Sequence, residues 1–266
     1  PMDKIVLMKP GWELQIENFK KCLRNMGKAG LTVLCYNFMP WSLRVGRTSY
    51  EKPIRGGALS SCFCWRDWDD ARRTEDGETT HEEMWKNLEV FLKEVVPVAE
   101  EAGVFMALHP DDPPFPRLCG LARIMTSPEN LQKLLDLYPS PHNGITFCQG
   151  TISTMGVQKR EGGMPDVIRS LGHRVHFVHF RDVVGCADDG FTEVWQDEGQ
   201  TDMLACLRAW KEVGFAGPIR PDHVPLVEGE EGHGTGDKAK GYFSGKASGY
   251  TMLGRLFAVG YMRGLF

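Results

Sequence analysis

The sequence predicts an α/β fold in which successive strand–helix units build a parallel sheet. Short apolar runs alternate along the chain with longer patterns whose apolar residues recur at helical spacing. Polar residues that can bind a metal or transfer a proton stand at the ends of four apolar runs. Because right-handed crossovers bring the carboxyl ends of parallel strands to one face, we expect these residues to share one site.

The composition is that of a single globular domain, which we expect to span residues 1–266. Hydrophobic residues make up 42% of the chain, and 31 Lys and Arg stand against 35 Asp and Glu. A slightly acidic chain without a basic block is a poor match for nucleic acid, since phosphate binding needs clustered cations. No apolar run approaches the roughly 18 residues of a membrane span, and the N-terminus lacks a signal-peptide pattern. We therefore expect neither nucleic acid nor a membrane as a partner.

The eight cysteines lack the C-x-x-C spacing of zinc ribbons and thioredoxin-like redox sites. A chain of this length buries enough apolar surface to fold without disulfides. The ordinary role of such thiols is that of small buried side chains in a reducing compartment. These features predict a cytoplasmic protein.

Five apolar runs are predicted to form the strands of the parallel sheet. Ile5–Leu7 is a candidate for a sixth strand at an edge. The five runs are Thr32–Met39, Val104–Leu108, Gly144–Cys148, Val175–Phe180 and Gly217–Arg220.

The first three helices are predicted from apolar periodicity and from residues that begin or end helices. Ile16–Ala29 has apolar residues at helical spacing and is followed by Gly30, a common helix end. Thr80 is a typical N-cap for a long helix, and Pro97 is expected to kink the end of that helix. The third helix, at 127–137, begins Ser-Pro-Glu, which places proline at the first helical position.

Three further helical patterns occur at Pro165–Leu171, Asp202–Val213 and Tyr250–Leu265. Two connections, Trp41–Thr79 and Val224–Gly249, are much longer than the usual links in a compact domain. The second of them is rich in glycine and charged residues. Since both follow a predicted strand, we expect functional lids or disordered loops above the site face.

Four strand ends carry residue types that bind divalent cations. His109, Cys148, His179 and Asp222 follow one another at spacings of 39, 31 and 43 residues, each about one strand–helix unit. Singly, each residue has an ordinary interpretation, such as a core histidine or a small buried thiol. Together, two imidazoles, a thiolate and a carboxylate in register predict a divalent metal site. The thiolate by itself favours zinc, because sulfur is a soft ligand.

His176 precedes the predicted ligand His179 by three residues. Strand alternation directs the two side chains to opposite faces of the sheet. His179 lies nearer the strand end and is therefore the predicted ligand. His176 either faces the helix layer as a structural residue or binds substrate, if a bulge turns it into the site.

Three polar residues near strand ends are candidates for binding substrate. Asp112, together with Asp111, lies in a proline-rich segment, where it either orients a ligand or substrate hydroxyl or forms a turn. Arg47, in the first long connection, can pair with a substrate carboxylate as a fork, and a solvated surface arginine is the alternative. Asn37, at the end of the first predicted strand, is a candidate hydroxyl binder.

His223 and Tyr250 are the candidates for proton transfer. His223 follows Asp222, and an imidazole beside a metal suits proton transfer near neutral pH. Tyr250 follows the glycine-rich connection, and closure of that loop would bring its phenol to the metal. The alternatives are a structural histidine and a packing tyrosine.

Six segments together resemble the mannonate dehydratase family, and the similarity runs from about Ile16 to the C-terminus. They are Cys35-Tyr36-Asn37-Phe38-Met39-Pro40, His109-Pro110-Asp111-Asp112-Pro113-Pro114, Thr146-Phe147-Cys148, His176-Phe177-Val178-His179-Phe180-Arg181, Arg220-Pro221-Asp222-His223 and Gly249-Tyr250-Thr251-Met252-Leu253-Gly254-Arg255-Leu256. The second segment is too specific to arise easily by chance.

The resemblance implies a xylose-isomerase-like TIM barrel and a hydro-lyase that converts D-mannonate into 2-keto-3-deoxy-D-gluconate in hexuronate breakdown. It also implies a divalent metal, usually manganese, with magnesium, iron and zinc as alternatives. The family's metal ligands fall on His109, Cys148, His179 and Asp222, its acid–base residues on His223 and Tyr250, and its arginine–threonine pair on Arg47-Thr48.

The chain departs from the family pattern in three places. The spacing at Trp41–Gly46 and the glycine-rich tract before Tyr250 are longer, and two strand–helix units that family members carry before Ile16–Ala29 are missing. A closed barrel needs eight strands, so we expect a TIM-type (β/α) barrel domain that lacks its first one or two units and is N-terminally incomplete. The exposed edges of such a barrel favour association or low stability, and a homo-oligomer is the expectation if association prevails.

Dehydration of a sugar acid needs the groups that these residues supply. A divalent cation stabilises the charge that develops when a base removes the C2 proton, and an acid protonates the leaving C3 hydroxyl. We therefore expect a small sugar acid as the partner. Three other functions stay open: a metal-dependent sugar isomerase or epimerase on the same barrel, a metal-dependent phosphodiesterase, which the acidic balance disfavours, and a truncated relative that binds a sugar acid without turnover.

Overall fold

The computed structural model describes residues 2–40, 42, 46–230 and 249–265. The chain forms two compact units, and each unit is assembled from three separate segments. The first unit comprises Pro1–Arg44, Asp69–Phe147 and Leu171–Val178, and the second comprises Val45–Trp68, Cys148–Ser170 and His179–Phe266.

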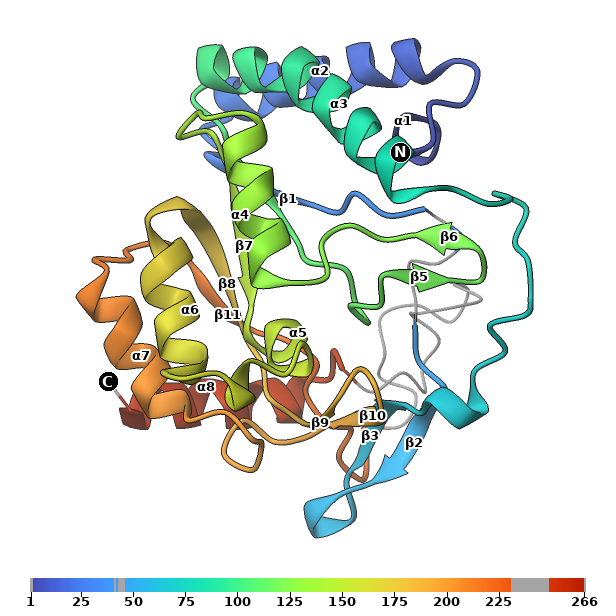
Figure 1. Cartoon of the computed structure of the whole chain (residues 1–266). Helices are drawn as coiled ribbons and strands as arrows, with labels where there is room; N and C mark the ends of the chain where they lie inside the picture. The colour runs from blue at the N-terminus through green and yellow to red at the C-terminus, as the bar shows by residue number, and fades with distance from the viewer. Residues whose placement is uncertain (1, 41, 43–45, 231–248, 266) are drawn as a thin grey trace. The chain divides into compact units, whose positions relative to one another are not determined.

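A five-stranded sheet with the order β1-β4-β7-β8-β11 confirms the five predicted strands (Figure 1). The strands are β1 (Val33–Tyr36), β4 (Phe105–Leu108), β7 (Asn143–Cys148), β8 (Val175–Phe180) and β11 (Ile219–Pro221). β1 pairs in parallel with β4, and β4 pairs in parallel with β7. Neighbouring strands of this sheet follow one another along the chain with helices between them, which is the repeat of a (β/α) barrel wall.

The register of the sheet aligns the ends of neighbouring strands. Tyr36, the last residue of β1, pairs with Leu108, the last residue of β4, and the N–H of His109 donates to the carbonyl of Tyr36 at 2.8 Å. In the second unit, the N–H of Asp222 donates to the carbonyl of Phe180, at the end of β8, at 3.3 Å. Within each unit, the residues that directly follow neighbouring strands therefore lie at the same edge of the sheet.

The first unit contains four helices, α1 (Asp3–Val6), α2 (Trp12–Lys28), α3 (His81–Ala102) and α4 (Pro128–Leu137). Three of them were predicted, but the expected edge strand at Ile5–Leu7 is wrong. Ile5 and Val6 lie in α1 and are buried where it packs against α2 and α3, and Leu7 is the C-cap of α1. A short apolar run fits a strand and a buried helical turn equally well, and here tertiary packing selects the helix.

α3 begins with a capping box at the predicted N-cap, Thr80. The hydroxyl of Thr80 accepts a hydrogen bond from the N–H of Glu83 at 3.1 Å, and the Glu83 carboxylate accepts one from the N–H of Thr80 at 2.8 Å. These two bonds satisfy two backbone donors that the first turn of a helix leaves without partners. The bonds from Thr80 also lower the pKa of Glu83.

Replacing Thr80 by alanine is expected to lower the free energy of unfolding by about 1 kcal/mol, because the N–H of Glu83 loses its acceptor. Thr80→Ser keeps the hydroxyl and is the matched control, expected to stay close to the parent protein. Urea-induced unfolding followed by circular dichroism measures the difference. Equal stabilities of the alanine and serine variants would show that the cap contributes nothing.

Pro97 does not mark the end of α3, which continues to Ala102. Proline removes one backbone hydrogen bond from the helix. Val96 and Val98, on either side of Pro97, are buried, and this packing of the helix outweighs the loss. The helix ends instead at Gly103, whose φ of 66° is the left-handed conformation that glycine adopts readily.

The helices of the second unit are α5 (Gln149–Thr154), α6 (Gly163–Leu171), whose last residue falls in the first unit, α7 (Met203–Glu212) and α8 (Met252–Leu265). α6, α7 and α8 were predicted, whereas the six residues of α5 were too few to show a period. Asp202 caps α7 by accepting a hydrogen bond from the N–H of Ala205 at 2.8 Å. Tyr250 is not the first residue of the last helix, as predicted, but precedes α8 by two residues.

The first long connection, Trp41–Thr79, is not a structureless loop over its described length, because it contains two strands. β2 (Ser49–Pro53) and β3 (Leu59–Phe63) join β10 (Gly190–Glu193) and β9 (Val183–Cys186) in a sheet with the order β2-β3-β10-β9. The buried rings of Phe63 and Phe191 stack with centroids 6.1 Å apart. β3 pairs with the neighbouring β2 on one side and with β10, far along the chain, on the other, and this second pairing does not show in the local sequence.

Shorter elements complete the description. They are β5 (Arg117–Leu118), β6 (Leu121–Ala122) and the 3₁₀ turns η2 (Arg55–Gly57), η3 (Trp65–Asp67), η4 (Val157–Lys159) and η5 (Gly172–Arg174). The predictions made for Trp41, for residues 43–45 and for the glycine-rich stretch 231–248 of the second long connection lie outside the described residues.

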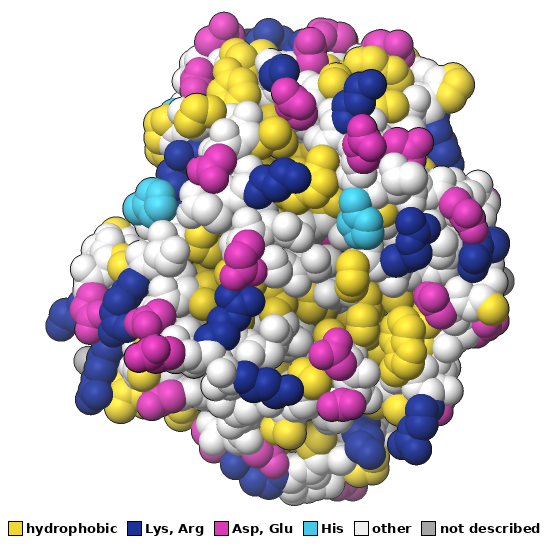
Figure 2. Space-filling model, viewed as in Figure 1, with side chains coloured by type: hydrophobic (Ala, Val, Ile, Leu, Met, Phe, Trp, Pro, Cys, Tyr) yellow, Lys and Arg dark blue, Asp and Glu magenta, His cyan; other side chains and the backbone are white. Residues whose placement is uncertain are grey.

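On the face drawn in Figure 2, Lys and Arg side chains are interspersed with Asp and Glu side chains. Positive charge on this face is therefore spread among negative charge rather than gathered in one block. Among the described residues, none of the helices combines the length and the hydropathy needed to cross a lipid bilayer.

Candidate active site

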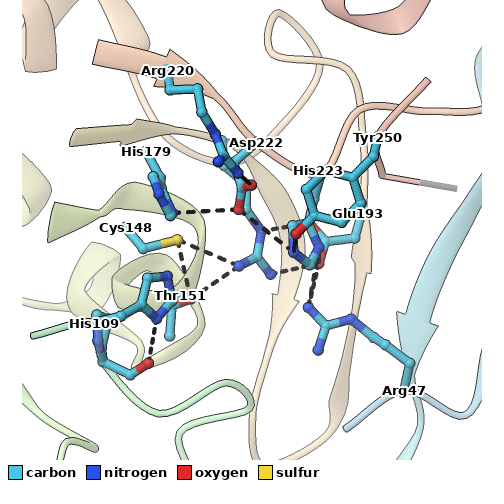
Figure 3. A network of polar contacts seen from close by, with 12 residues as sticks. Arg47, His109, Cys148, Thr151, His179, Glu193, Arg220, Asp222, His223 and Tyr250 are labelled. Atoms are coloured by element: carbon cyan, nitrogen blue, oxygen red, sulfur yellow. Dashed lines mark hydrogen bonds and ion pairs between the residues drawn. The ribbon is translucent and has the colours of Figure 1, made fainter. Parts of the chain in front are cut away.

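Cys148 is a buried sulfur ligand candidate at the end of β7 in the second unit. The hydroxyl of Thr151, one turn further on in α5, donates to its sulfur at 3.2 Å. Nη1 of Arg181 donates to the same sulfur at 3.4 Å (Figure 3). A sulfur atom that accepts two hydrogen bonds, one from a cation, is suited to carry the negative charge of the thiolate, which is the form that binds metals.

His179 and Asp222 lie next to each other and close to Cys148. His179 is the fifth residue of β8, and Asp222 directly follows β11. Nδ1 of His179 lies 3.5 Å from Oδ2 of Asp222, and a ring nitrogen of His179 lies within 4.8 Å of the Cys148 sulfur. The second unit therefore brings together three of the four metal ligands that the sequence predicts.

The carboxyl group of Asp222 is held in its charged form. Burial by itself would raise its pKa, but the electrostatic interactions with His223, His179 and Arg220 outweigh burial and leave the pKa well below its ordinary value. Arg220, two residues earlier on the same strand, donates a hydrogen bond to Oδ1 of Asp222. A carboxylate kept anionic is the form that binds a metal.

Glu193 is a buried carboxylate at the end of β10 that the sequence analysis did not single out. Arg181 donates to both of its oxygens, from Nε at 2.7 Å and from Nη2 at 2.5 Å, and Nη2 of Arg47 donates to Oε1 at 2.6 Å. Burial raises the pKa of Glu193, but Arg181, His223 and Arg47 together lower it to about 2. Glu193 is therefore an anion near neutral pH.

Arg47 is not positioned as a fork for a substrate carboxylate, as the sequence analysis proposed. Its side chain is only 3% exposed, and its guanidinium pairs with Glu193 and lies over the ring of Phe191, 4.9 Å from the ring centroid. A buried guanidinium needs a counter-charge, and this protein supplies one itself. The surface alternative is equally wrong, because Arg47 belongs to the interior of the second unit.

His223 links Glu193 to Tyr250, the second residue proposed for proton transfer. Its Nδ1 lies 3.1 Å from Oε1 of Glu193, and its Nε2 lies 3.4 Å from the hydroxyl oxygen of Tyr250 and 3.5 Å from Oδ2 of Asp222 (Figure 3). The backbone of His223 has a φ of 51°, in the left-handed region that non-glycine residues rarely adopt. Such strain is typical of functional positions held by their surroundings.

Tyr250 lies next to His223 because a β-bridge joins the backbone segments that contain the two residues. Val224 and Gly249 form an antiparallel bridge, with the N–H of Val224 donating to the carbonyl of Gly249 at 3.1 Å. The rings of His223 and Tyr250 meet edge to face with centroids 5.6 Å apart. Residues 27 positions apart in the chain thus become one polar pair.

His109 belongs to the first unit, where it directly follows β4. Its Nδ1–H donates to the carbonyl of Pro110 at 2.6 Å, which leaves the lone pair of the ring on Nε2. A backbone carbonyl that holds the other ring nitrogen is typical of metal-binding histidines. Its role as the fourth ligand stays a prediction from the sequence.

The two aspartates that follow His109, Asp111 and Asp112, differ in their surroundings. Asp111 is buried and accepts a hydrogen bond from the N–H of Met125 at 2.8 Å, a contact that organises its own loop. Asp112 is half-buried. Asn37, after β1, is exposed. Asp112 and Asn37 stay candidates for binding substrate hydroxyls.

His176 lies among packing residues at the beginning of β8 rather than at its carboxyl end. Its ring lies 4.8 Å from the ring of Phe105, the first residue of β4, and it fills the space that a side chain on Gly144 would need. Burial lowers the pKa of His176 to about 4, so the ring is neutral. These contacts favour the structural alternative over substrate binding, because strand alternation turns His176 away from the face of His179.

The donors present in the second unit fit a divalent metal ion. Ligand atoms bonded to one ion at about 2.0–2.3 Å lie no more than about 4.6 Å apart. The separations of His179 from Asp222, at 3.5 Å, and from Cys148, within 4.8 Å, are close to this range. Sulfur, imidazole nitrogen and carboxylate oxygen are all ligands of first-row transition metals. These residues could therefore hold such an ion.

Comparison with known proteins places the chain in a family. The family profile described as D-mannonate dehydratase (UxuA) matches residues 1–79 and 71–266. "Mannonate dehydratase 2" of Halalkalibacterium halodurans is 35% identical over 268 residues, which cover 90% of this chain and 76% of that protein. The chain belongs to the D-mannonate dehydratase family.

Solved structures agree with this membership in the mannonate dehydratase family. The crystal structure of mannonate dehydratase from Streptococcus suis serotype 2 matches with a TM-score of 0.85 and 33% identity, over 99% of this chain and 72% of that chain. A D-allulose 3-epimerase from Methylomonas sp. matches with a TM-score of 0.56 at 13% identity, over 100% of this chain and 74% of that chain. The second similarity concerns the fold alone, and together they establish a TIM-type α/β fold.

Sequence reasoning about this mannonate dehydratase family member missed Arg181 and Glu193 for different reasons. Arg181 lies in one of the six segments that carry the family resemblance, so its position was visible although its role was not. Glu193 ends the four-residue strand Gly-Phe-Thr-Glu, where nothing in the local sequence marks it. Only its pairing with Arg181 reveals it.

Proposed function

We propose that this chain catalyses the dehydration of D-mannonate to 2-keto-3-deoxy-D-gluconate, a step of hexuronate breakdown. The observation that carries the proposal is the partly buried polar group in which His223 lies between Glu193 and Tyr250, directly after Asp222. Such a group supplies one base and one acid beside a candidate metal ligand, as the removal of water from a sugar acid requires. Relatives that match most of the chain are named for this substrate.

Cys148, His179 and Asp222 are proposed to bind one divalent ion, with His109 as the fourth ligand. The buried sulfur and the anionic carboxylate support this set, as does the lone pair of His109 on Nε2. We propose Mn²⁺ on the family resemblance, with zinc as the competitor that a thiolate favours. When bound, the ion supplies a Lewis acid for the negative charge that develops beside the substrate carboxylate.

His223 and Tyr250 are proposed to perform the two proton transfers. One of them removes the proton from C2 and the other protonates the departing C3 hydroxyl. Because Nε2 of His223 and the phenol oxygen of Tyr250 lie 3.4 Å apart, a proton can be returned from one to the other after each turnover. Glu193 remains anionic throughout, since its two arginine partners stabilise its charge.

The substrate is proposed to be held by residues other than Arg47. Asn37 and Asp112 are the proposed hydroxyl binders, because both are polar residues that follow strands of the parallel sheet. Arg220, whose side chain is 44% exposed, is a cation of the second unit that is accessible to a carboxylate while it pairs with Asp222. Its guanidinium has donors beyond the one that Asp222 accepts.

Purified protein supplied with Mn²⁺ is expected to form a keto-deoxy acid from D-mannonate, detected by NMR of the product. Protein treated with a chelator is the control, and it should regain activity when Mn²⁺ is restored. Parallel assays with neutral ketoses and aldoses test the competing isomerase or epimerase function. Exchange between those sugars, with D-mannonate left unchanged, would contradict the dehydratase proposal.

The cellular setting is a separate part of the proposal. We infer a cytoplasmic location, because the eight cysteines, none of which forms a disulfide, would stay reduced there. A homo-oligomer remains a prediction from the sequence.

A further inference from the structure

Glu193 has an unusual number of partners for one buried carboxylate. It receives two hydrogen bonds from Arg181 and one from Arg47, and it also contacts Nδ1 of His223 at 3.1 Å. The side chains of Glu193, Arg181 and Arg47 are all no more than 3% exposed. A salt bridge that served stability alone would not need the histidine proposed for proton transfer as a third partner.

We propose that Glu193 is a positioning residue of the reaction, which holds the His223 ring so that its Nε2 faces Tyr250. The inference rests on the proposed function of His223, and it names a residue to which the proposed mechanism gives no step. Glu193 does not touch the reacting atoms in this proposal and acts only through His223.

The hydrogen-bonding chemistry of the two groups determines the tautomer. A carboxylate only accepts hydrogen bonds, so the ring nitrogen that faces Glu193 must carry a proton. Nη2 of Arg47 also lies near Nδ1, at 3.5 Å, but it is farther from Nδ1 than Glu193 is and already donates to Glu193 at 2.6 Å. Nε2 also lies near a carboxylate, at 3.5 Å from Oδ2 of Asp222, but Glu193 is closer to the ring, at 3.1 Å from Nδ1. Nδ1–H therefore donates to Glu193, and Nε2 is the nitrogen that faces Tyr250 and exchanges protons.

The position of Glu193 is itself set by elements that do not belong to the parallel sheet. Glu193 ends β10, which pairs with β3 and β9, and Arg47 lies just before β2 in the same antiparallel sheet. The two parallel bonds from Arg181 fix the plane of the carboxylate, as bidentate pairs do. The antiparallel sheet thus provides a rigid support for the histidine.

Arg181 connects this support to the proposed metal ligands. It donates to Glu193 with Nε and Nη2 and to Thr151 and Cys148 with Nη1. Gly150 leaves room for its side chain, because a Cβ there would lie 2.5 Å from Cγ of Arg181. One buried guanidinium therefore couples the position of the sulfur ligand to that of the proton-transfer residue.

Glu193→Asp is the variant that tests the proposal, because it keeps the charge for Arg181 and Arg47 but withdraws the carboxylate from His223. We expect kcat to fall about tenfold to a hundredfold, since misplacement of a catalytic group by about 1 Å has that effect, while KM stays within about twofold. Glu198→Asp is the matched control, because Glu198 also pairs with an arginine in the second unit, Arg55 at 3.9 Å. The control should keep the parent kcat.

Two readouts separate positioning from a merely structural role. In a His223→Asn background, Glu193→Asp should lower kcat by less than about twofold further, because Glu193 acts through the missing ring. In the metal-free parent protein labelled with ¹⁵N, the His223 ring should show a protonated Nδ1, assigned by its loss in His223→Asn. Glu193→Asp should weaken that signal.

A parent ring protonated on Nε2 instead of Nδ1 would overturn the inference even if no variant folds. A Glu193→Asp enzyme with the kcat of the parent and an unchanged ring signal would overturn it as well. If the parent protein does not dehydrate D-mannonate, the proposed function fails, but the NMR measurement still decides whether Glu193 positions His223.

Discussion

Replacing Cys148 by serine is expected to remove most of the divalent metal from the purified protein. Changes in residues that only support a metal ligand already cost 10–100-fold in affinity, so loss of a ligand should cost about a hundredfold or more. A serine hydroxyl keeps its proton near neutral pH, whereas the Cys148 sulfur accepts hydrogen bonds from Thr151 and Arg181 that favour a charged ligand. Elemental analysis of the protein, followed by assays with added Mn²⁺, measures the effect.

Cys206→Ser is the matched control for this experiment. Cys206 is also fully buried in the second unit, in α7, but burial raises the pKa of its thiol to about 12. It is therefore a neutral packing residue, and its serine variant should keep the metal content of the parent. Unchanged metal occupancy in Cys148→Ser would remove Cys148 from the site and leave His179 and Asp222 without their sulfur partner.

Replacing His223 by asparagine is expected to lower kcat by about 10²–10⁴-fold, the usual contribution of a general acid or base. Asparagine tolerates the left-handed backbone at this position, where φ is 51°, better than most residues do. The loss should therefore reflect the missing imidazole rather than a rearranged loop. Metal content should stay at the parent level, and kcat measured at saturating D-mannonate tests the prediction.

His176→Asn provides the comparison for His223→Asn. His176 packs against Phe105 and Gly144, so its replacement should lower thermal stability while kcat changes little. A large loss of kcat in His176→Asn would restore its candidacy as a substrate-binding residue. A His223→Asn enzyme that retains kcat within about tenfold of the parent would exclude His223 as the proton-transfer group.

Much of the fold follows from local patterns that residues near one another in the chain determine. The predicted N-cap at Thr80 and the Ser127 start of α4 are correct, because capping needs only residues within one turn. The five strands of the parallel sheet are also correct, since buried strands read as apolar runs. Each of these features is determined by a few consecutive residues.

The errors occur where contacts between distant residues decide the structure. Ile5–Leu7 became helical because α2 and α3 offer it a surface to pack against. β2 and β3 formed because β10, far along the chain, pairs with β3. Arg47 turned inward because Glu193 neutralises it. The partners α3, β10 and Glu193 all lie outside the local window of sequence on which the predictions depended.

The sequence by itself determined the order of the main strands and helices, the family, and the polar residues at or just after the strand ends, including Cys148, His179, Asp222 and His223. Only the tertiary structure decided which groups these residues meet. Glu193 has no local signature and Arg181 shows only its position, and their roles exist only because the antiparallel sheet brings a carboxylate to a buried guanidinium and to His223. The physical reason is that a buried charge is stable only beside its counter-charge, and folding alone brings those partners together.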